Sequence, residues 1–231
     1  MKNKILVFSF IVIMIFTITA CGKQEPNNED AIKFKEEYES LNEVSRNNKV
    51  YRSISIDENN PFIYITAEEL LKKIDNEETF YVYFGSKFCP WCRSVIEKAI
   101  EVAKKKGVSK IYYIDICDDE GNEILRDKYI IDSNNELKQS INGTDDYYEI
   151  LNRFDSILSD YTLVDKNGNK IDVGEKRIFA PNFVYVKNGN AEVLVDGISD
   201  KQENSNEELT NEILEDETEI FSGFFEEDCG C

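Results

Sequence analysis

The segment FGSKFCPWCRS, from Phe84 to Ser94, constrains the fold of this chain more than any other part of it. Its two cysteines, Cys89 and Cys92, lie between two apolar segments of different periodicity. Residues 79–85 are almost continuously apolar, which is typical of a strand covered on both faces. Residues 94–107 instead repeat apolar side chains at helical spacing. The pattern predicts a strand, a cysteine pair and a helix in direct succession.

A second apolar strand is predicted directly after this helix, at residues 108–116. A strand, a helix and a second strand in this order imply that the two strands pair in parallel. Upstream, Thr66 is followed three residues later by Glu69, a capping-box pattern that predicts the start of a helix. Residues 50–56 and 62–65 are rich in β-branched and aromatic side chains, which predicts two more strands.

The chain changes character between about residues 117 and 176. Residues 122–131 and 145–158 are predicted to be helices, and residues 161–173 to form a hairpin. Two strands joined at Asn188-Gly189 and a C-terminal helix complete the pattern. We therefore expect an α/β domain, a central mixed sheet flanked by helices, with a largely helical insertion.

The first twenty residues have the pattern of an export signal. A basic MKNK precedes about fifteen apolar residues, fewer than the roughly 20 that span a bilayer. Residues 18–21, Ile-Thr-Ala-Cys, resemble a bacterial lipobox, which implies cleavage before Cys21 and lipidation of that cysteine. An ordinary signal peptide or an uncleaved anchor is the alternative. We expect a lipid-anchored protein on the extracytoplasmic face of a bacterial membrane.

The expected organisation after the signal has three parts. Residues 21–48 are polar and suit a tether, with a short helix from about residue 31. Residues 49–220 are long enough for one domain with its own core. Residues 221–231 are expected to be a flexible tail that ends in Cys229-Gly-Cys231.

Charge and composition exclude several kinds of chemistry. The net charge of −19 argues against nucleic acid or an anionic membrane surface as a partner. The chain contains no histidine, which excludes imidazole bases, Cys-His nucleophile pairs and histidine-ligated metals. Disulfides can persist in exported proteins. Beside Cys89 and Cys92, the domain then carries the pair Cys229/Cys231 and the single Cys117.

The placement of the cysteine pair favours redox chemistry. At a helix N-terminus, Cys89 would face unpaired backbone N–H groups and the positive end of the helix dipole, which lower a thiol pKa. Lys87 and Arg93 add positive charge nearby. Cys92, one turn further in, would be shielded and able to attack a mixed disulfide. Trp91 offers an apolar surface on which a polypeptide could dock.

Two other interpretations of the pair remain open. A zinc site would need two further ligands, either Cys229 and Cys231 or carboxylates, and a thiolate carrier of a soft ion such as Cu(I) would need similar donors. An inert staple is a weaker alternative, because a disulfide across two residues closes too small a loop to gain much. We predict no metal and no cofactor other than a redox-active Cys89–Cys92 disulfide.

The remaining cysteines carry separate hypotheses. Cys229 and Cys231 could exchange with Cys89 and Cys92 as a redox relay, form a mobile metal clip, or pair only with each other. Cys117 ends a predicted buried strand, and we expect it to be a small core residue.

The segments YVYFGSKFCPWCRS, IYYIDI and AP-NFVYVKNG resemble the thioredoxin-like superfamily. The pattern is similar to the thioredoxin-like lipoproteins of low-GC Gram-positive bacteria and to the bacteriocin transport accessory group, and it covers roughly residues 62–116 and 177–215. The resemblance implies a thioredoxin-like fold with the dithiol at a helix start. It also implies that Pro181 is a cis-proline that faces the dithiol and binds an extended substrate strand. A proline is otherwise tolerated at the first position of a strand, which is the structural alternative.

Three features depart from the thioredoxin pattern. Tyr83 occupies the position of a buried acid that helps to deprotonate the second cysteine, which argues against efficient thioredoxin-type reduction. Ala180, before Pro181, is small and lacks a hydroxyl. The insertion of about sixty residues is far longer than an ordinary connection, and it would lie near the active-site end of the sheet, where it could shape substrate access.

These observations predict a membrane-anchored thiol–disulfide oxidoreductase that acts on cysteines of exported proteins. Cys89 would exchange with the substrate, Cys92 would resolve, and Trp91 and Pro181 would contact the substrate chain. A membrane electron donor or acceptor is the expected second partner. The alternatives are a non-catalytic accessory or binding lipoprotein with the same fold and a Cu or Zn thiolate carrier.

Overall fold

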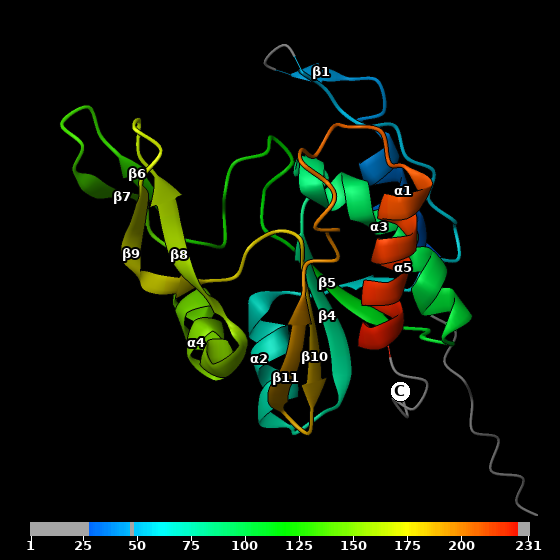
Figure 1. The fold of residues 1–231 in the computed structure, drawn as a ribbon. Helices are drawn as coiled ribbons and strands as arrows, with labels where there is room; N and C mark the ends of the chain where they lie inside the picture. The colour runs from blue at the N-terminus through cyan, green and yellow to red at the C-terminus, as the bar shows by residue number, and fades with distance from the viewer. Residues whose placement is uncertain (1–27, 47–48, 226–231) are drawn as a thin grey trace, which may run out of the picture.

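The computed structural model describes residues 28–46 and 49–225 (Figure 1). The signal residues, the lipidation candidate Cys21 and the tail cysteines Cys229 and Cys231 lie outside the described residues. Among the described residues, no helix combines the length and apolar character needed to cross a bilayer.

Five strands form the central sheet, in the order β11-β10-β4-β5-β3. These strands are β3 (Phe62–Tyr64), β4 (Phe80–Gly85), β5 (Ile111–Asp115), β10 (Asn182–Lys187) and β11 (Asn190–Val195). Strand β5 pairs in parallel with β3 and with β4, whereas β10 is antiparallel to both β4 and β11. The expected mixed sheet flanked by helices is therefore confirmed, and so is the parallel pairing around the cysteine motif.

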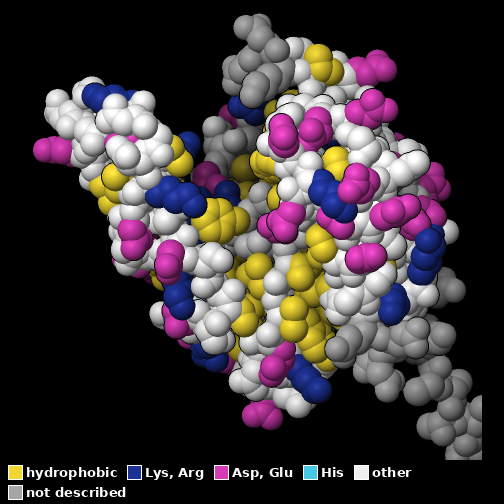
Figure 2. All heavy atoms as spheres, viewed as in Figure 1, with side chains coloured by type: hydrophobic (Ala, Val, Ile, Leu, Met, Phe, Trp, Pro, Cys, Tyr) yellow, Lys and Arg dark blue, Asp and Glu magenta, His cyan; other side chains and the backbone are white. Residues whose placement is uncertain are grey.

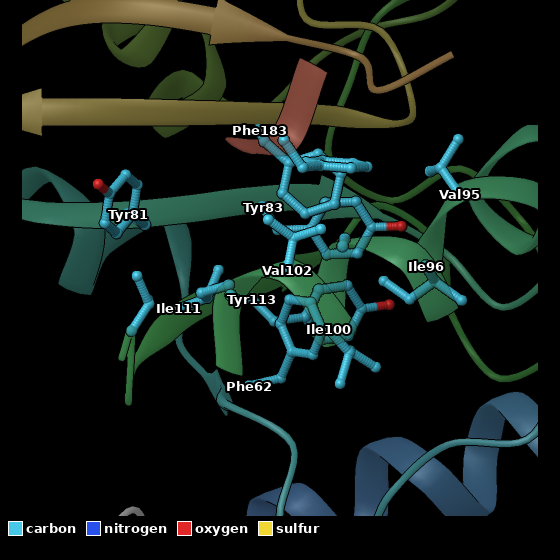
Figure 3. Close-up of a cluster of buried hydrophobic side chains, with 14 of the residues drawn as sticks. Phe62, Tyr81, Tyr83, Val95, Ile96, Ile100, Val102, Ile111, Tyr113 and Phe183 are labelled. Carbon is cyan, nitrogen blue, oxygen red and sulfur yellow. The ribbon is translucent and has the colours of Figure 1, made fainter. Parts of the chain in front are cut away.

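Helices cover both faces of the sheet (Figure 1). The helices are α1 (Asn28–Glu39), α2 (Ala67–Asp75), α3 (Pro90–Lys105), α4 (Asp145–Phe154) and α5 (Asn211–Phe224). Successive side chains of a strand point to opposite faces, so β4 supplies both cores. Tyr81 and Tyr83 pack with α1, α3 and α5, while Val82 and Phe84 pack with α2 and α4. Figure 3 shows part of the first cluster, with Tyr83 lying flat between its neighbours.

The N-terminal helix corrects our assignment of residues 21–48 to a polar tether. Phe34 and Tyr38 of α1 are fully buried, and the Phe34 ring stacks on Phe62 with 4.2 Å between ring centroids. Residues 28–39 are therefore part of the domain. The same holds at the other end, because Phe221 and Phe225 are fully buried where we expected a flexible tail.

The prediction of a strand at residues 50–56 is wrong. Beyond the two-residue strands β1 (Ser45–Arg46) and β2 (Lys49–Val50), this segment has no strand partner among the described residues. Its backbone N–H groups donate to side chains instead: Ile54 N–H to Asn42 Oδ1 and Ile56 N–H to Glu39 Oε1. Side-chain acceptors thus replace the strand ladder that the apolar composition suggested.

The prediction of a largely helical insertion is also wrong. The insertion contains two hairpins and the helix α4, which continues into the short 3-10 helix η1 (Asp155–Ile157). The strands are β6 (Lys128–Ile131), β7 (Leu137–Ile141), β8 (Ser159–Val164) and β9 (Lys170–Arg177). Residues 122–131 were expected to be helical. Directly after them, Asp132 Oδ1 accepts the N–H groups of Asn134 and Glu136 and closes a tight turn between β6 and β7. This local turn favours the β6–β7 hairpin over a helix.

Candidate redox site

Cys89 lies at the N-terminus of α3, four residues after the end of β4. It is the N-cap residue, with extended backbone angles of φ −82° and ψ 115°, and Pro90 occupies the first helical position. Its Sγ accepts the backbone N–H of Cys92 at 3.2 Å. A cap residue accepts one of the N–H groups that the first helical turn leaves unpaired. The predicted placement of Cys89 at a helix start is confirmed.

The two sulfurs lie in different environments. Cys89 is partly exposed, whereas Cys92 is fully buried. The hydrogen bond with the Cys92 side chain is the largest influence on the pKa of the Cys89 thiol and lowers it; the Cys92 N–H and the Arg126 charge act in the same direction, against burial. Burial raises the pKa of Cys92 well above its ordinary value, and the neighbouring Cys89 raises it further. The arrangement thus favours the thiolate form at Cys89 and the thiol form at Cys92.

The loop before β10 lies directly against the Cys89 sulfur. The Ala180–Pro181 peptide bond is cis. The Cys89 thiol lies 3.3 Å from the carbonyl oxygen of Ala180, to which it donates. Asn182 fixes the loop, because its Oδ1 accepts the backbone N–H of Phe179 at 2.7 Å. The structure therefore brings the predicted residues Cys89 and Pro181 together from segments about ninety residues apart.

Trp91 and Pro181 share the wall of a small pocket next to this loop. The pocket has a volume of about 300 Å³ and is also lined by Phe179, Leu194 and Ile198. Trp91 is partly exposed. The predicted docking residue thus lies beside the proline, on the side of Cys89 that faces β11.

Tyr83 links the buried cysteine to the hydrophobic core. Its hydroxyl lies 3.1 Å from that of Tyr38, and its ring stacks on Phe183 with 4.4 Å between centroids (Figure 3). A hydrogen bond from Tyr83 lowers the pKa of the Cys92 thiol, against the larger effect of burial. A Cβ atom at Gly85 would overlap the Tyr83 hydroxyl, so only glycine leaves room for it. A phenol therefore contacts Cys92 where we noted the missing acid.

The cation next to Cys89 is not the one that we predicted. Arg93 is fully buried and donates to the carbonyl oxygens of Tyr38 and Arg52, so it ties the N-terminal segment to α3. Arg126, from the insertion, is instead the charge that lowers the Cys89 pKa. Sequence reasoning missed Arg126 because only the tertiary fold brings it near the motif.

Lys87 forms an ion pair with Asp119, with 3.5 Å between Nζ and Oδ1. Its positive charge is therefore shared with a carboxylate of the insertion. The positive charge that we predicted at Lys87 is present next to the motif, but it is paired.

Cys117 is only in part the core residue that we expected, because it packs against the second core cluster without being fully buried. It is half-buried and lines the same pocket as Cys89. Burial raises its pKa to about 11, so Cys117 remains a thiol at neutral pH. The neighbouring Asp115 accepts the Cys117 N–H at 3.0 Å, and burial raises the pKa of its carboxyl to about 6.

A pocket of about 610 Å³ opens beside Cys89, between the central sheet and the insertion. In Figure 2 the molecular face is hollowed between these two parts, with basic, acidic and hydrophobic side chains along the walls. The β8–β9 hairpin contributes Tyr161 and Leu163 to one wall, and Phe88 and Cys117 lie on the other. The insertion therefore shapes the approach to Cys89.

Metal binding gains no support from the described side chains. Within residues 28–46 and 49–225, no group of three or more Cys, Asp or Glu residues is arranged to hold a metal ion. Cys89, Cys92 and Cys117 are all free thiols. The tail cysteines that a zinc site or a relay would require lie outside these residues.

A scan against protein-family models finds no match to this chain, and a search of curated proteins finds none either.

Proposed function

We propose that this chain is a thioredoxin-like thiol–disulfide oxidoreductase that acts on exported polypeptides from a lipid anchor at Cys21. The observation that carries the proposal is the inequality of the two cysteines. Cys89 is a partly exposed helix cap with a lowered pKa, and Cys92 is a fully buried thiol one turn further along. A reactive thiolate beside a shielded thiol is the arrangement that disulfide exchange requires.

Reduction of a substrate disulfide would proceed in two exchanges. The Cys89 thiolate attacks one substrate sulfur, the substrate S–S bond breaks, and the released substrate thiolate takes up a proton. Cys92 then loses its proton and attacks Cys89, and the mixed disulfide breaks to release the second substrate thiol. Two electrons pass to the substrate, and a Cys89–Cys92 disulfide forms. The reverse sequence oxidises a substrate dithiol.

Other residues would orient the substrate or stabilise a thiolate and would not themselves be oxidised or reduced. The carbonyl of Ala180 lies against the Cys89 sulfur, so a substrate strand that crosses Pro181 would pass directly over the nucleophile. The Tyr83 hydroxyl stabilises the Cys92 thiolate during the second exchange, because it donates a hydrogen bond to that sulfur. A membrane donor or acceptor would return the pair to its starting state.

Mixed-disulfide trapping tests this function. In a Cys92→Ser variant, Cys89 can attack a disulfide-containing protein, but the product cannot be resolved by Cys92. We expect a stable covalent adduct on non-reducing gels. Cys89→Ser should form no adduct. Cys117→Ser, made in the Cys92→Ser protein, is the control: Cys117 remains a thiol at neutral pH, so the adduct should still form. If Cys92→Ser forms no adduct, the chain is a non-catalytic binding lipoprotein instead.

A further inference from the structure

The pocket beside Cys89 has an unusual charge for this chain. Its lining includes Arg46, Arg126 and Arg177 but no aspartate or glutamate. The chain as a whole has a net charge of −19, with 46 acidic and 27 basic residues. The three arginines come from β1, from the insertion and from the end of β9, so the fold collects them from separate segments.

The arginines differ in how they are held. Arg126 pairs with Glu123 at 2.6 Å, and Arg177 pairs with Asp127 at 2.9 Å, so both guanidinium groups are fixed in place. Arg46 is exposed and forms no ion pair with any residue that the structure describes. Its guanidinium lies over the Phe88 ring, 5.4 Å from the centroid. Arg46 is therefore the cation that is free to meet a ligand.

The pocket continues past Cys89 on the other side. Arg177, Phe179 and Ala180 line both this pocket and the smaller one beside Trp91 and Pro181. The two pockets are thus neighbours that meet at residues 177–180, on either side of the reactive sulfur. We call the two together the Cys89 groove; one carboxylate, Asp196, lines its smaller pocket. A ligand that fills it must extend in both directions from the atom that reacts, as a polypeptide segment does.

We propose that the Cys89 groove selects polypeptide segments that carry aspartate or glutamate next to the reactive cysteine. The remainder of this acidic surface repels such segments, whereas the groove offers the Arg46 guanidinium, which can hydrogen-bond a carboxylate. Aromatic walls at Tyr51, Phe88 and Tyr161 can cover the apolar parts of the same segment. The proposal rests on the proposed exchange reaction and names its substrate class.

Peptide binding tests the selection without redox chemistry. The probe is a labelled peptide with serine in place of its cysteine and two glutamates on each side. Its twin carries glutamine at those four positions. With full-length Cys89→Ser protein at low ionic strength, we expect the glutamate peptide to bind about tenfold more tightly than the glutamine peptide. Added salt should reduce this difference in affinity.

Two charge variants assign the effect to the groove. Arg46→Glu, made in the Cys89→Ser protein, should weaken binding of the glutamate peptide about fivefold and leave the glutamine twin unchanged. Lys187→Glu is the matched control, because it changes the net charge equally. Lys187 is exposed at the end of β10 opposite Pro181.

Equal affinity for the two peptides would overturn the proposed selection. So would a Lys187→Glu variant that weakens binding of the glutamate peptide as much as Arg46→Glu does. Trapping of the disulfide-linked dimers of cysteine-containing versions of both peptides by Cys92→Ser separates the two proposals, because Cys89 attacks one peptide sulfur and the other peptide leaves as a thiol. If both peptides are trapped at equal rates and bind equally, the selection fails and the exchange reaction stands. If neither is trapped while the glutamate peptide still binds better, the exchange reaction fails and the groove is an acidic-peptide site.

Discussion

At the scale of single residues, the site depends on how one fold treats two identical side chains. Cys89 caps α3, accepts the Cys92 N–H and lies in the field of Arg126. Cys92 is enclosed by the core and contacts Tyr83. The first environment favours the thiolate and the second favours the thiol. A difference in surroundings, rather than in chemistry, separates the proposed nucleophile from the proposed resolving group.

The Cys89 pKa should therefore lie below the roughly 8.5 of an ordinary thiol. Arg126→Gln removes a cation that stabilises the thiolate, so the pKa should rise and less thiolate should be present at neutral pH. The rate of Cys89 alkylation as a function of pH measures the shift. Lys187→Gln, which removes a distant positive charge, should leave the profile unchanged; an equal effect of the two variants would contradict a local role for Arg126.

Removal of the Tyr83 hydroxyl should affect both stability and the second exchange. Tyr83→Phe keeps the ring stacked on Phe183 but leaves the Tyr38 hydroxyl without this partner. We expect a loss of about 1 kcal/mol in the free energy of unfolding. The Cys92 pKa should rise further, which slows resolution of a mixed disulfide at neutral pH.

Tyr113→Phe is the matched control for that substitution. The Tyr113 hydroxyl is also buried, but it acts on the pKa of the Asp115 carboxyl and forms no hydrogen bond with Cys92. Its removal should leave the resolution rate unchanged. If Tyr113→Phe slows resolution as much as Tyr83→Phe does, the effect belongs to core packing and not to the phenol next to Cys92.

At the scale of elements, local patterns specify the framework on which the site is built. Thr66 and Glu69 form the predicted capping box at the start of α2: the Thr66 side chain accepts the Glu69 N–H, and the Glu69 side chain accepts the Thr66 N–H. Thr66→Ala should lower the free energy of unfolding by about 1 kcal/mol. Urea denaturation measures this loss, and Cys89 alkylation should not change. A stability unchanged by the substitution would contradict the capping role.

The sequence predicted those parts whose cause is local. The apolar run of β4, the helical spacing of α3 and the turn at Asn188-Gly189 each carry their own signal, and all three elements are present. The β6–β7 hairpin was missed because the side chain of Asp132, rather than apolar periodicity, determines it. Arg126 was missed because its proximity to Cys89 is a product of the tertiary fold.

At the scale of the whole molecule, one buried carboxyl couples stability to pH. Glu217 of α5 is fully buried, and neither carboxyl oxygen has a hydrogen-bond partner among the described residues. Burial raises its pKa to about 7, although Lys98 and Arg52 act in the opposite direction. The folded protein therefore holds a proton there that the unfolded chain releases above about pH 4.3.

The stabilisation that the protonated Glu217 carboxyl contributes is fully present below about pH 4.3 and is lost as the pH rises through 7. Glu217→Gln keeps the shape without the charge, so the variant should gain stability over the wild type as the pH rises from 5 to 8. Denaturant unfolding at both pH values measures the difference. Asp115, whose raised pKa acts in the same direction, is present in both proteins and cancels.

The exposed Glu219 on the same helix provides the control. Glu219→Gln makes the same chemical change without removing a buried charge. It should leave the dependence of unfolding free energy on pH like that of the wild type. If the free energy of unfolding of Glu217→Gln depends on pH as that of the wild type does, the Glu217 carboxyl does not titrate between pH 5 and 8.

A reversible redox pair formed by Cys89 and Cys92 is the basis of the proposed function. It is tested most directly by equilibration of the protein with a series of thiol–disulfide buffers, followed by alkylation of the remaining thiols. We predict a single two-electron transition that is fully reversible and is lost in both Cys89→Ser and Cys92→Ser. A pair that stays reduced in every buffer, or a transition that persists in Cys92→Ser, would contradict the account.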